Sequence, residues 1–207
     1  LARRLDAIYS TRYRPTGSAG RLHVMQMPRY GDIASANVIG LSPRSWQDFD
    51  PAGHTGRTLA HELVHDRVWM QVPRSDPLFV LAREGFPGYF HLPALDAALG
   101  DGRYAERIRR IEARYRQYRE TGTDGRGGSL PPEKPILAIT ADEIGIYKDR
   151  FVLPDRVVLF FDAIRSRLGP AGFDVFTRDL FARQELDRPG FEAIVLEHLP
   201  DFGPELR

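Results

Sequence analysis

The feature that most constrains this chain is the stretch His61-Glu62-Leu63-Val64-His65, which has the pattern HExxH. On a helix, residues four apart lie on one face about a turn apart, so the two imidazoles can hold one metal ion. The Glu beside them can take a proton from a water that the metal holds. The motif therefore predicts one Zn²⁺ per chain, with His61 and His65 as ligands and Glu62 as the general base.

A catalytic zinc needs a third protein ligand and one open position. The chain has no cysteine, so the third ligand has to be His, Asp or Glu. A metzincin would carry HExxHxxGxxH, but Val68 and Gln71 stand where its Gly and third His belong. Glu84 follows the motif after eighteen intervening residues, in a stretch expected to form the next helix. We therefore predict that Glu84 is the third ligand.

Apolar spacing and the positions of Gly and Pro predict a mostly helical α+β fold. Residues 21–27 and 33–42 are expected to form two antiparallel strands, and Pro87 is expected to kink or break the helix that carries Glu84. The predicted helices are 1–10, 56–71, 78–90, 93–99, 103–120, 140–148, 154–168, 171–184 and 189–198. The expected organisation is one catalytic domain over 1–207, with a strand-containing lobe (1–72) and an all-helical lobe (73–207).

Charge and hydropathy narrow the classes of partner. The formal net charge is +1, and glutamates are interleaved with the arginines of 103–120, so no nucleic-acid partner is expected. No run of eighteen apolar residues is present, so no membrane-spanning segment is predicted. Because the first residue is Leu1 and not Met, we expect a piece of a longer protein. The compartment and the oligomeric state stay open.

The stretch around Glu84 reads REGFPGYF over 83–90. Together with HELVH and the spacing of eighteen residues, it resembles the gluzincin family of aminopeptidase N and leukotriene hydrolases, whose signature is HExxH-x18-E inside a phrase like NEGFASYF. The resemblance is strongest over about 54–91. It implies a thermolysin-like zincin catalytic domain and a zinc peptidase that acts on a peptide or protein substrate.

The resemblance also points to residues outside the motif. The family uses a Tyr roughly sixty residues after the ligand Glu to donate to the oxyanion, and Tyr147 stands sixty-three residues after Glu84. The family binds the substrate's free amine through a GxMEN strand, and Ala36 and Asn37 stand where its Glu and Asn would be. A methyl group cannot pair with an ammonium, so either the enzyme cuts internally or another group anchors the amine.

Two other functions compete with a peptidase. One is a non-catalytic zinc-binding relative that acts as a peptide-binding or interaction module, which the Ala36 replacement favours. The other is an interaction domain built on the Arg-rich segment 103–120, with HELVH accidental. The presence of Glu62 favours catalysis, because a purely structural zinc has no need of a general base.

Overall fold

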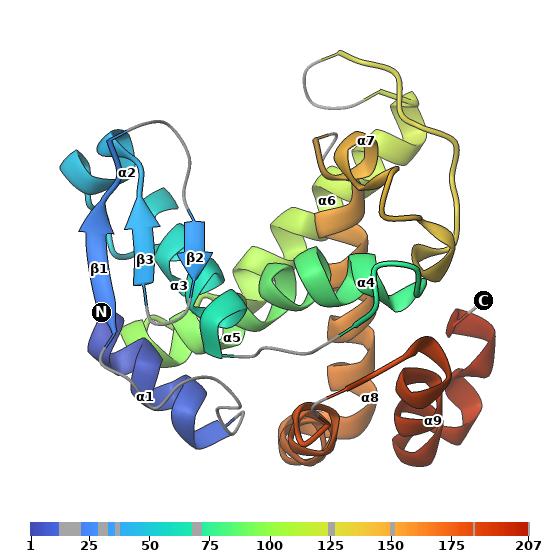
Figure 1. The fold of residues 1–207 in the computed structure, drawn as a ribbon. Helices are drawn as coiled ribbons and strands as arrows, with labels where there is room; N and C mark the ends of the chain where they lie inside the picture. The colour runs from blue at the N-terminus through green and yellow to red at the C-terminus, as the bar shows by residue number, and fades with distance from the viewer. Residues whose placement is uncertain are drawn as a thin grey trace. The chain divides into compact units, whose positions relative to one another are not determined.

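The computed structural model describes residues 1–12, 22–28, 33–35, 38–67, 72–123, 127–149, 152–183 and 185–206. The chain divides into two compact units. The first unit comprises Leu1–Trp69 and Phe90–Tyr104, and the second comprises Met70–Tyr89 and Ala105–Arg207. Most described residues are helical and one small sheet is present, which confirms the predicted α+β, mostly helical class (Figure 1).

The sheet of the first unit contains β1 (His23–Gln26), β2 (Ile33–Ser35) and β3 (Val38–Leu41), in the order β1-β3-β2 (Figure 1). The predicted single strand over 33–42 is wrong, because β2 and β3 are separate and pair antiparallel. The antiparallel pairing expected between the first strand and the next is also wrong, since β1 pairs parallel with β3. With β2 reversing the chain, β3 regains the direction of β1.

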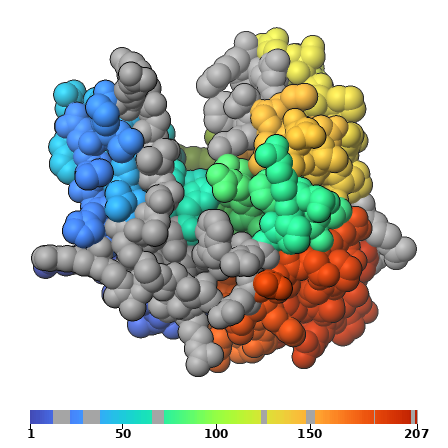
Figure 2. All heavy atoms as spheres, in the orientation of Figure 1, coloured from blue at the N-terminus to red at the C-terminus, as the bar shows by residue number. Residues whose placement is uncertain are grey.

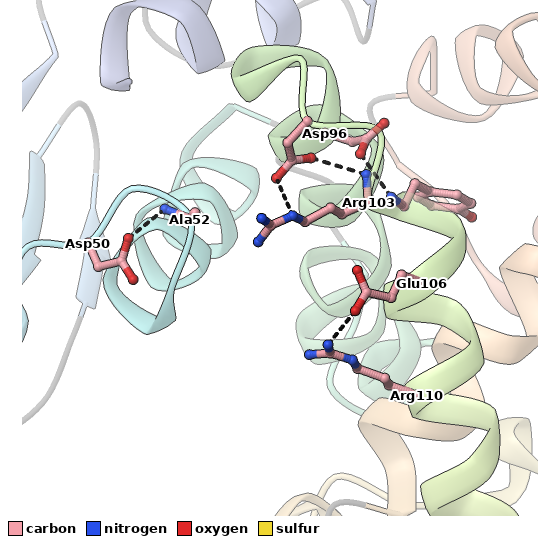
Figure 3. Close-up of polar contacts among 8 residues, drawn as sticks. Asp50, Ala52, Asp96, Arg103, Glu106 and Arg110 are labelled. Atoms are coloured by element: carbon pink, nitrogen blue, oxygen red, sulfur yellow. Dashed lines mark hydrogen bonds and ion pairs between the residues drawn. The ribbon is translucent and has the colours of Figure 1, made fainter.

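Three helices accompany the sheet: α1 (Ala2–Arg12), α2 (Pro43–Gln47) and α3 (His54–Arg67). Helix α3 packs against α1, β2 and β3. The Tyr9 hydroxyl of α1 donates to the Ala60 carbonyl of α3 across 2.9 Å in a buried contact. Just before α3, the Asp50 carboxylate accepts the Ala52 N–H at 3.0 Å (Figure 3). The motif therefore lies on a packed helix, as predicted.

A continuous helical run follows from Leu78 to Leu99, where two shorter helices were predicted. It consists of α4 (Leu78–Val80), the π-helix η1 (Leu81–Gly85) and α5 (Phe86–Leu99). Asp76 accepts the Leu78 N–H at 2.7 Å, which satisfies one free donor at the start of the run. Pro87 is the second residue of α5, directly after the π-helix, and Pro93 lies inside α5.

Helix α6 (Tyr104–Thr121) closely matches the predicted helix 103–120. The Asp96 carboxylate at the end of α5 accepts the Tyr104 N–H at 2.8 Å, so it satisfies a donor at the start of α6 (Figure 3). An i,i+4 ion pair joins Glu106 and Arg110 on its surface, also drawn in Figure 3. Glu112 and Arg116 form a second exposed i,i+4 pair on this helix, and such pairs are typical of a solvated face.

The rest of the second unit is helical: η2 (Ile136–Ala138), α7 (Ile144–Asp149), α8 (Val152–Phe181), α9 (Arg188–His198) and η3 (Pro200–Leu206). Gly169, at φ +69°, interrupts α8 where two helices were predicted to meet. Aromatic rings fill the core, with Phe161 lying 5.6 Å from Phe86 and 5.3 Å from Tyr89 between ring centroids. None of the helices in the described ranges is long and apolar enough to cross a bilayer.

Candidate metal centre

The apolar residues and the polar motif residues of helix α3 differ in how deeply they are buried. Its buried side chains are Leu59, Ala60, Leu63 and Val64. The motif residues His61, Glu62 and His65 are half-buried. The helix thus keeps its apolar positions in the core of the first unit while the polar groups of the motif stay within reach of solvent.

The two motif histidines face each other through their Nε2 atoms, which are 3.2 Å apart. Their ring centroids lie 4.9 Å apart at an interplanar angle of 70°. Two nitrogen ligands about 2.1 Å from a tetrahedral zinc would lie about 3.4 Å from each other. The spacing of His61 and His65 therefore fits a zinc bound through both Nε2 atoms, which leaves each Nδ1 for other contacts.

Glu84 lies in the π-helical turn Leu81–Gly85. In this turn the Phe86 N–H bonds to the Leu81 carbonyl, five residues back. Pro87 has no N–H to give the carbonyl of Arg83 four residues earlier, so regular α-helical bonding cannot continue through this point. Such wide turns often occur at functional sites, because they change where neighbouring side chains point.

One ligand atom from each of His61, His65 and Glu84 lies within 4.8 Å of the other two. In the described ranges this is the one group of at least three such side chains close enough to share a metal ion. Two imidazoles and a carboxylate form a known donor set of catalytic zinc sites, with the fourth position open. These are the three residues predicted as ligands, and the chemistry of their side chains fits zinc.

Glu62 neighbours His61 in sequence on the same helix and is not one of these three residues. Glu62 is half-buried. An ionised carboxylate beside a zinc ligand set is suited to accept a proton. The local structure of α3 is therefore compatible with the predicted roles, in which His61 and His65 are ligands and Glu62 is the general base.

A third imidazole belongs to this part of the first unit. The ring of His91, on α5, lies 5.9 Å from that of His61 between centroids, at an interplanar angle of 65°. The sequence interpretation gave His91 no role. The available signal was its position seven residues after Glu84, two turns along the same helical run. Only the packing of α5 in the first unit shows which motif histidine it meets.

The other predicted site residues have different surroundings. Tyr147, on α7, is 3% exposed and its hydroxyl donates to the Pro132 carbonyl at 2.8 Å. The segment that contains Pro132 lies against α7, in yellow and light orange in Figure 2. Ala36 and Asn37, predicted to meet the substrate, lie outside the described residues.

The chain was also compared with families and proteins already characterised. No family model matches it, and neither does any curated protein.

Proposed function

We propose that this chain is a zinc metallopeptidase whose catalytic domain is thermolysin-like. The observation that carries the proposal is the convergence of ligand atoms from His61, His65 and Glu84 within 4.8 Å, with Glu62 next to a ligand in the sequence. A structural zinc site is usually closed by four protein ligands, whereas three ligands with a neighbouring carboxylate as general base fit metal-assisted hydrolysis better.

In this proposal His61 and His65 bind zinc through Nε2 and Glu84 through a carboxylate oxygen. When bound, the metal supplies a Lewis acid that polarises a peptide carbonyl and makes water more acidic. Glu62 accepts the proton of the attacking water and passes it to the amine nitrogen of the leaving peptide. The half-buried positions of the motif side chains support this role, because substrate and water can both reach them.

The sheet supports a peptide as the substrate. Strand β2 is at the edge of the described sheet, since it pairs with β3 alone, and it packs against the motif helix α3. An edge strand offers unpaired N–H and C=O groups that an extended peptide can bond. We propose that the substrate adds to this edge, which would lay its backbone along the helix that carries the histidines.

Two features refine the proposal. Tyr147 is the candidate oxyanion donor. For this role its hydroxyl would give up the hydrogen bond to the Pro132 carbonyl and donate to the substrate oxyanion instead. With Ala36 in place of an amine-binding Glu, we propose cleavage within peptides in preference to removal of amino-terminal residues.

The test is hydrolysis of a quenched peptide library by the parent chain and by Glu62→Gln. The parent should bind one zinc, cleave peptides and stop when a chelator removes the metal. Glu62→Gln should keep the zinc and lose roughly 10²–10⁴-fold in kcat, because general-base catalysis contributes about that factor. Acetylated and free-amine peptides should be cut at similar rates.

Glu112→Gln is the matched control, because Glu112 makes an exposed ion pair on α6 and should not affect turnover. A parent that binds zinc but cleaves nothing in the library would establish the non-catalytic module instead. A parent that binds no zinc would refute both functions, and a Glu62→Gln variant as active as the parent would refute the proposed base.

A further inference from the structure

Beyond the three ligands, the structure assigns a positioning role to His91: we infer that its ring holds the His61 imidazole in the orientation that binds the metal. The inference rests on the proposed zinc site. It concerns a contact inside the first unit, because His61 and His91 both belong to that unit. It does not make His91 a ligand, since His91 is not part of the group whose atoms lie within 4.8 Å.

The first argument is the environment of His91 on α5. Every residue of 86–95 is buried except His91, which is half-buried. Its sequence neighbours Phe90 and Leu92 are 0% and 3% exposed. A helix packed on all sides offers few places for a polar ring, and an apolar residue would serve packing alone at lower cost. An imidazole at the one partly open position of this stretch therefore has a role besides filling the core.

The second argument is geometric. The His91 ring meets the His61 ring edge-to-face, 5.9 Å between centroids at 65°, and His61 meets His65 in a similar way at 4.9 Å and 70°. Edge-to-face pairs prefer centroid separations of about 4.5–7 Å, so both contacts are favourable. His61 is thus the middle ring of three. Its rotation is restricted on one side by the partner that shares the metal and on another by His91.

The third argument concerns the cost of binding. A free histidine ring has to give up rotation about its side-chain bonds when it coordinates zinc. A ring that is already held with its Nε2 facing the second ligand, 3.2 Å away, loses less rotational freedom when it binds zinc. Groups that orient metal ligands typically contribute about 10–100-fold to metal affinity. We expect His91 to act at the low end of this range, because an aromatic contact is weaker than an ionic one.

The experiment measures the zinc dissociation constant by competition with a chelating dye, for the parent, His91→Ala, His91→Phe and His91→Asn. The free energy of unfolding of each metal-free protein is measured alongside. His91→Phe keeps a ring at this position and should bind zinc within about threefold of the parent. His91→Ala and His91→Asn lack the ring and should bind on the order of tenfold more weakly. His23→Ala, at an exposed position of β1, is the control and should bind as the parent does.

The inference would be overturned by unchanged affinity in both ringless variants, by His91→Phe binding as weakly as His91→Ala, or by affinity losses that follow the stability of the metal-free protein. Rescue by Asn but not by Phe would also overturn it, because a polar contact would then replace the ring contact. The Co²⁺-substituted proteins give a second readout. The ligand-field bands of the parent should persist in His91→Phe and shift in His91→Ala.

Failure of the inference differs from failure of the proposed function. The inference is judged by zinc affinity and by the Co²⁺ spectra, and the peptidase proposal by peptide cleavage in the zinc-loaded parent. A parent that binds zinc and does not cleave peptides would refute the peptidase, and the ring variants would still decide the role of His91.

Discussion

The environment of a single ionisable side chain decides its pKa and its contribution to stability, as Asp155 on α8 illustrates. Asp155 is 2% exposed, and its Oδ2 accepts a hydrogen bond from Nε of Arg114 at 2.7 Å. Burial raises the pKa of the Asp155 carboxyl, and the hydrogen bonds from Arg114 partly offset that rise. The same hydrogen bonds raise the pKa of Arg114. The pair joins α6 to α8 inside the second unit, so its loss should affect stability.

We predict that Arg114→Ala lowers the free energy of unfolding by about 1–3 kcal/mol near neutral pH, because a buried carboxylate loses its charged partner. Without Arg114, the pKa of Asp155 should rise further. A carboxyl whose pKa is raised on folding contributes stability below its unfolded pKa and loses it as pH rises through the folded value. The deficit of the variant should therefore be smaller at about pH 4 than at about pH 7.

Urea unfolding of parent and variant at the two pH values measures this difference. Arg116→Ala is the control on the same helix, because Arg116 pairs with Glu112 in an exposed i,i+4 contact. Its effect should stay within about 0.5 kcal/mol. Equal deficits for Arg114→Ala at both pH values would show that the Asp155 charge is not what the partner stabilises.

Sequence reasoning at the residue scale is sound where chemistry and spacing are local. His61 and His65 lie in one motif on one helix, so their proximity follows from helix geometry. Glu84 comes from the spacing of eighteen residues and the phrase around it, and its role as third ligand stays a prediction. The contact between His61 and His91 depends on how α5 packs in the first unit, and no local pattern gives it.

The same distinction holds for elements. The bounds of α1, α6 and α9 agree with the predicted 1–10, 103–120 and 189–198 to within a few residues, because spacing and turn residues mark them locally. The pattern of 33–42 predicts one strand, since its small residues contain no strong turn signal. Pairing direction in a sheet depends on partners elsewhere in the chain, so the parallel β1–β3 pair was beyond a local pattern.

The element that carries Glu84 gives the next prediction. A Cβ on Gly85 would lie 2.8 Å from Leu81 Cδ1 and 2.8 Å from Val157 Cγ1, closer than real contacts allow. Gly85→Ala should therefore push the π turn away from α8, lower the free energy of unfolding by about 1–3 kcal/mol and weaken zinc binding, because Glu84 precedes this residue.

Gly88→Ala is the matched control three residues along, where a Cβ would meet nothing within 4 Å. Ala in place of a helical Gly should raise the free energy of unfolding by up to about 1 kcal/mol, with zinc affinity unchanged. Denaturant unfolding and dye competition measure both quantities. If Gly85→Ala is as stable and binds zinc as tightly as the parent, the tight packing of this turn does not set the position of Glu84.

For the whole molecule, the class could be predicted from the sequence, because long helical patterns follow a short stretch with strands. Which elements belong to the same compact unit was harder to predict. The compact units are not continuous in sequence, since Phe90–Tyr104 belongs with Leu1–Trp69 and not with the residues on either side. A chain that leaves one unit and returns to it leaves no mark in composition. The order of the elements along the chain can be predicted from the sequence, but which segments share a hydrophobic core cannot.

The metal should act on the stability of the whole chain. Zinc that binds the folded protein and not the unfolded chain adds about 2.7 kcal/mol to the free energy of unfolding at a hundredfold excess over its dissociation constant. For a chain of 207 residues, 1 kcal/mol corresponds to about 2–4 °C in Tm, so zinc should raise Tm by roughly 5–10 °C. A chelator should reverse the rise, and Mg²⁺ should not reproduce it, because its preferred ligands are oxygens.

Two variants separate this effect from non-specific binding. His65→Ala removes one of the three proposed ligands and should lose most of the zinc-induced rise in Tm. Glu62→Gln should retain the rise in full, because the base is not a ligand, although the same variant loses turnover. Thermal unfolding of the three proteins with zinc, with Mg²⁺ and with chelator gives all of these values. A parent whose Tm ignores zinc, or a His65→Ala variant that responds like the parent, would place the metal elsewhere and leave the cluster on α3 and η1 without its proposed role.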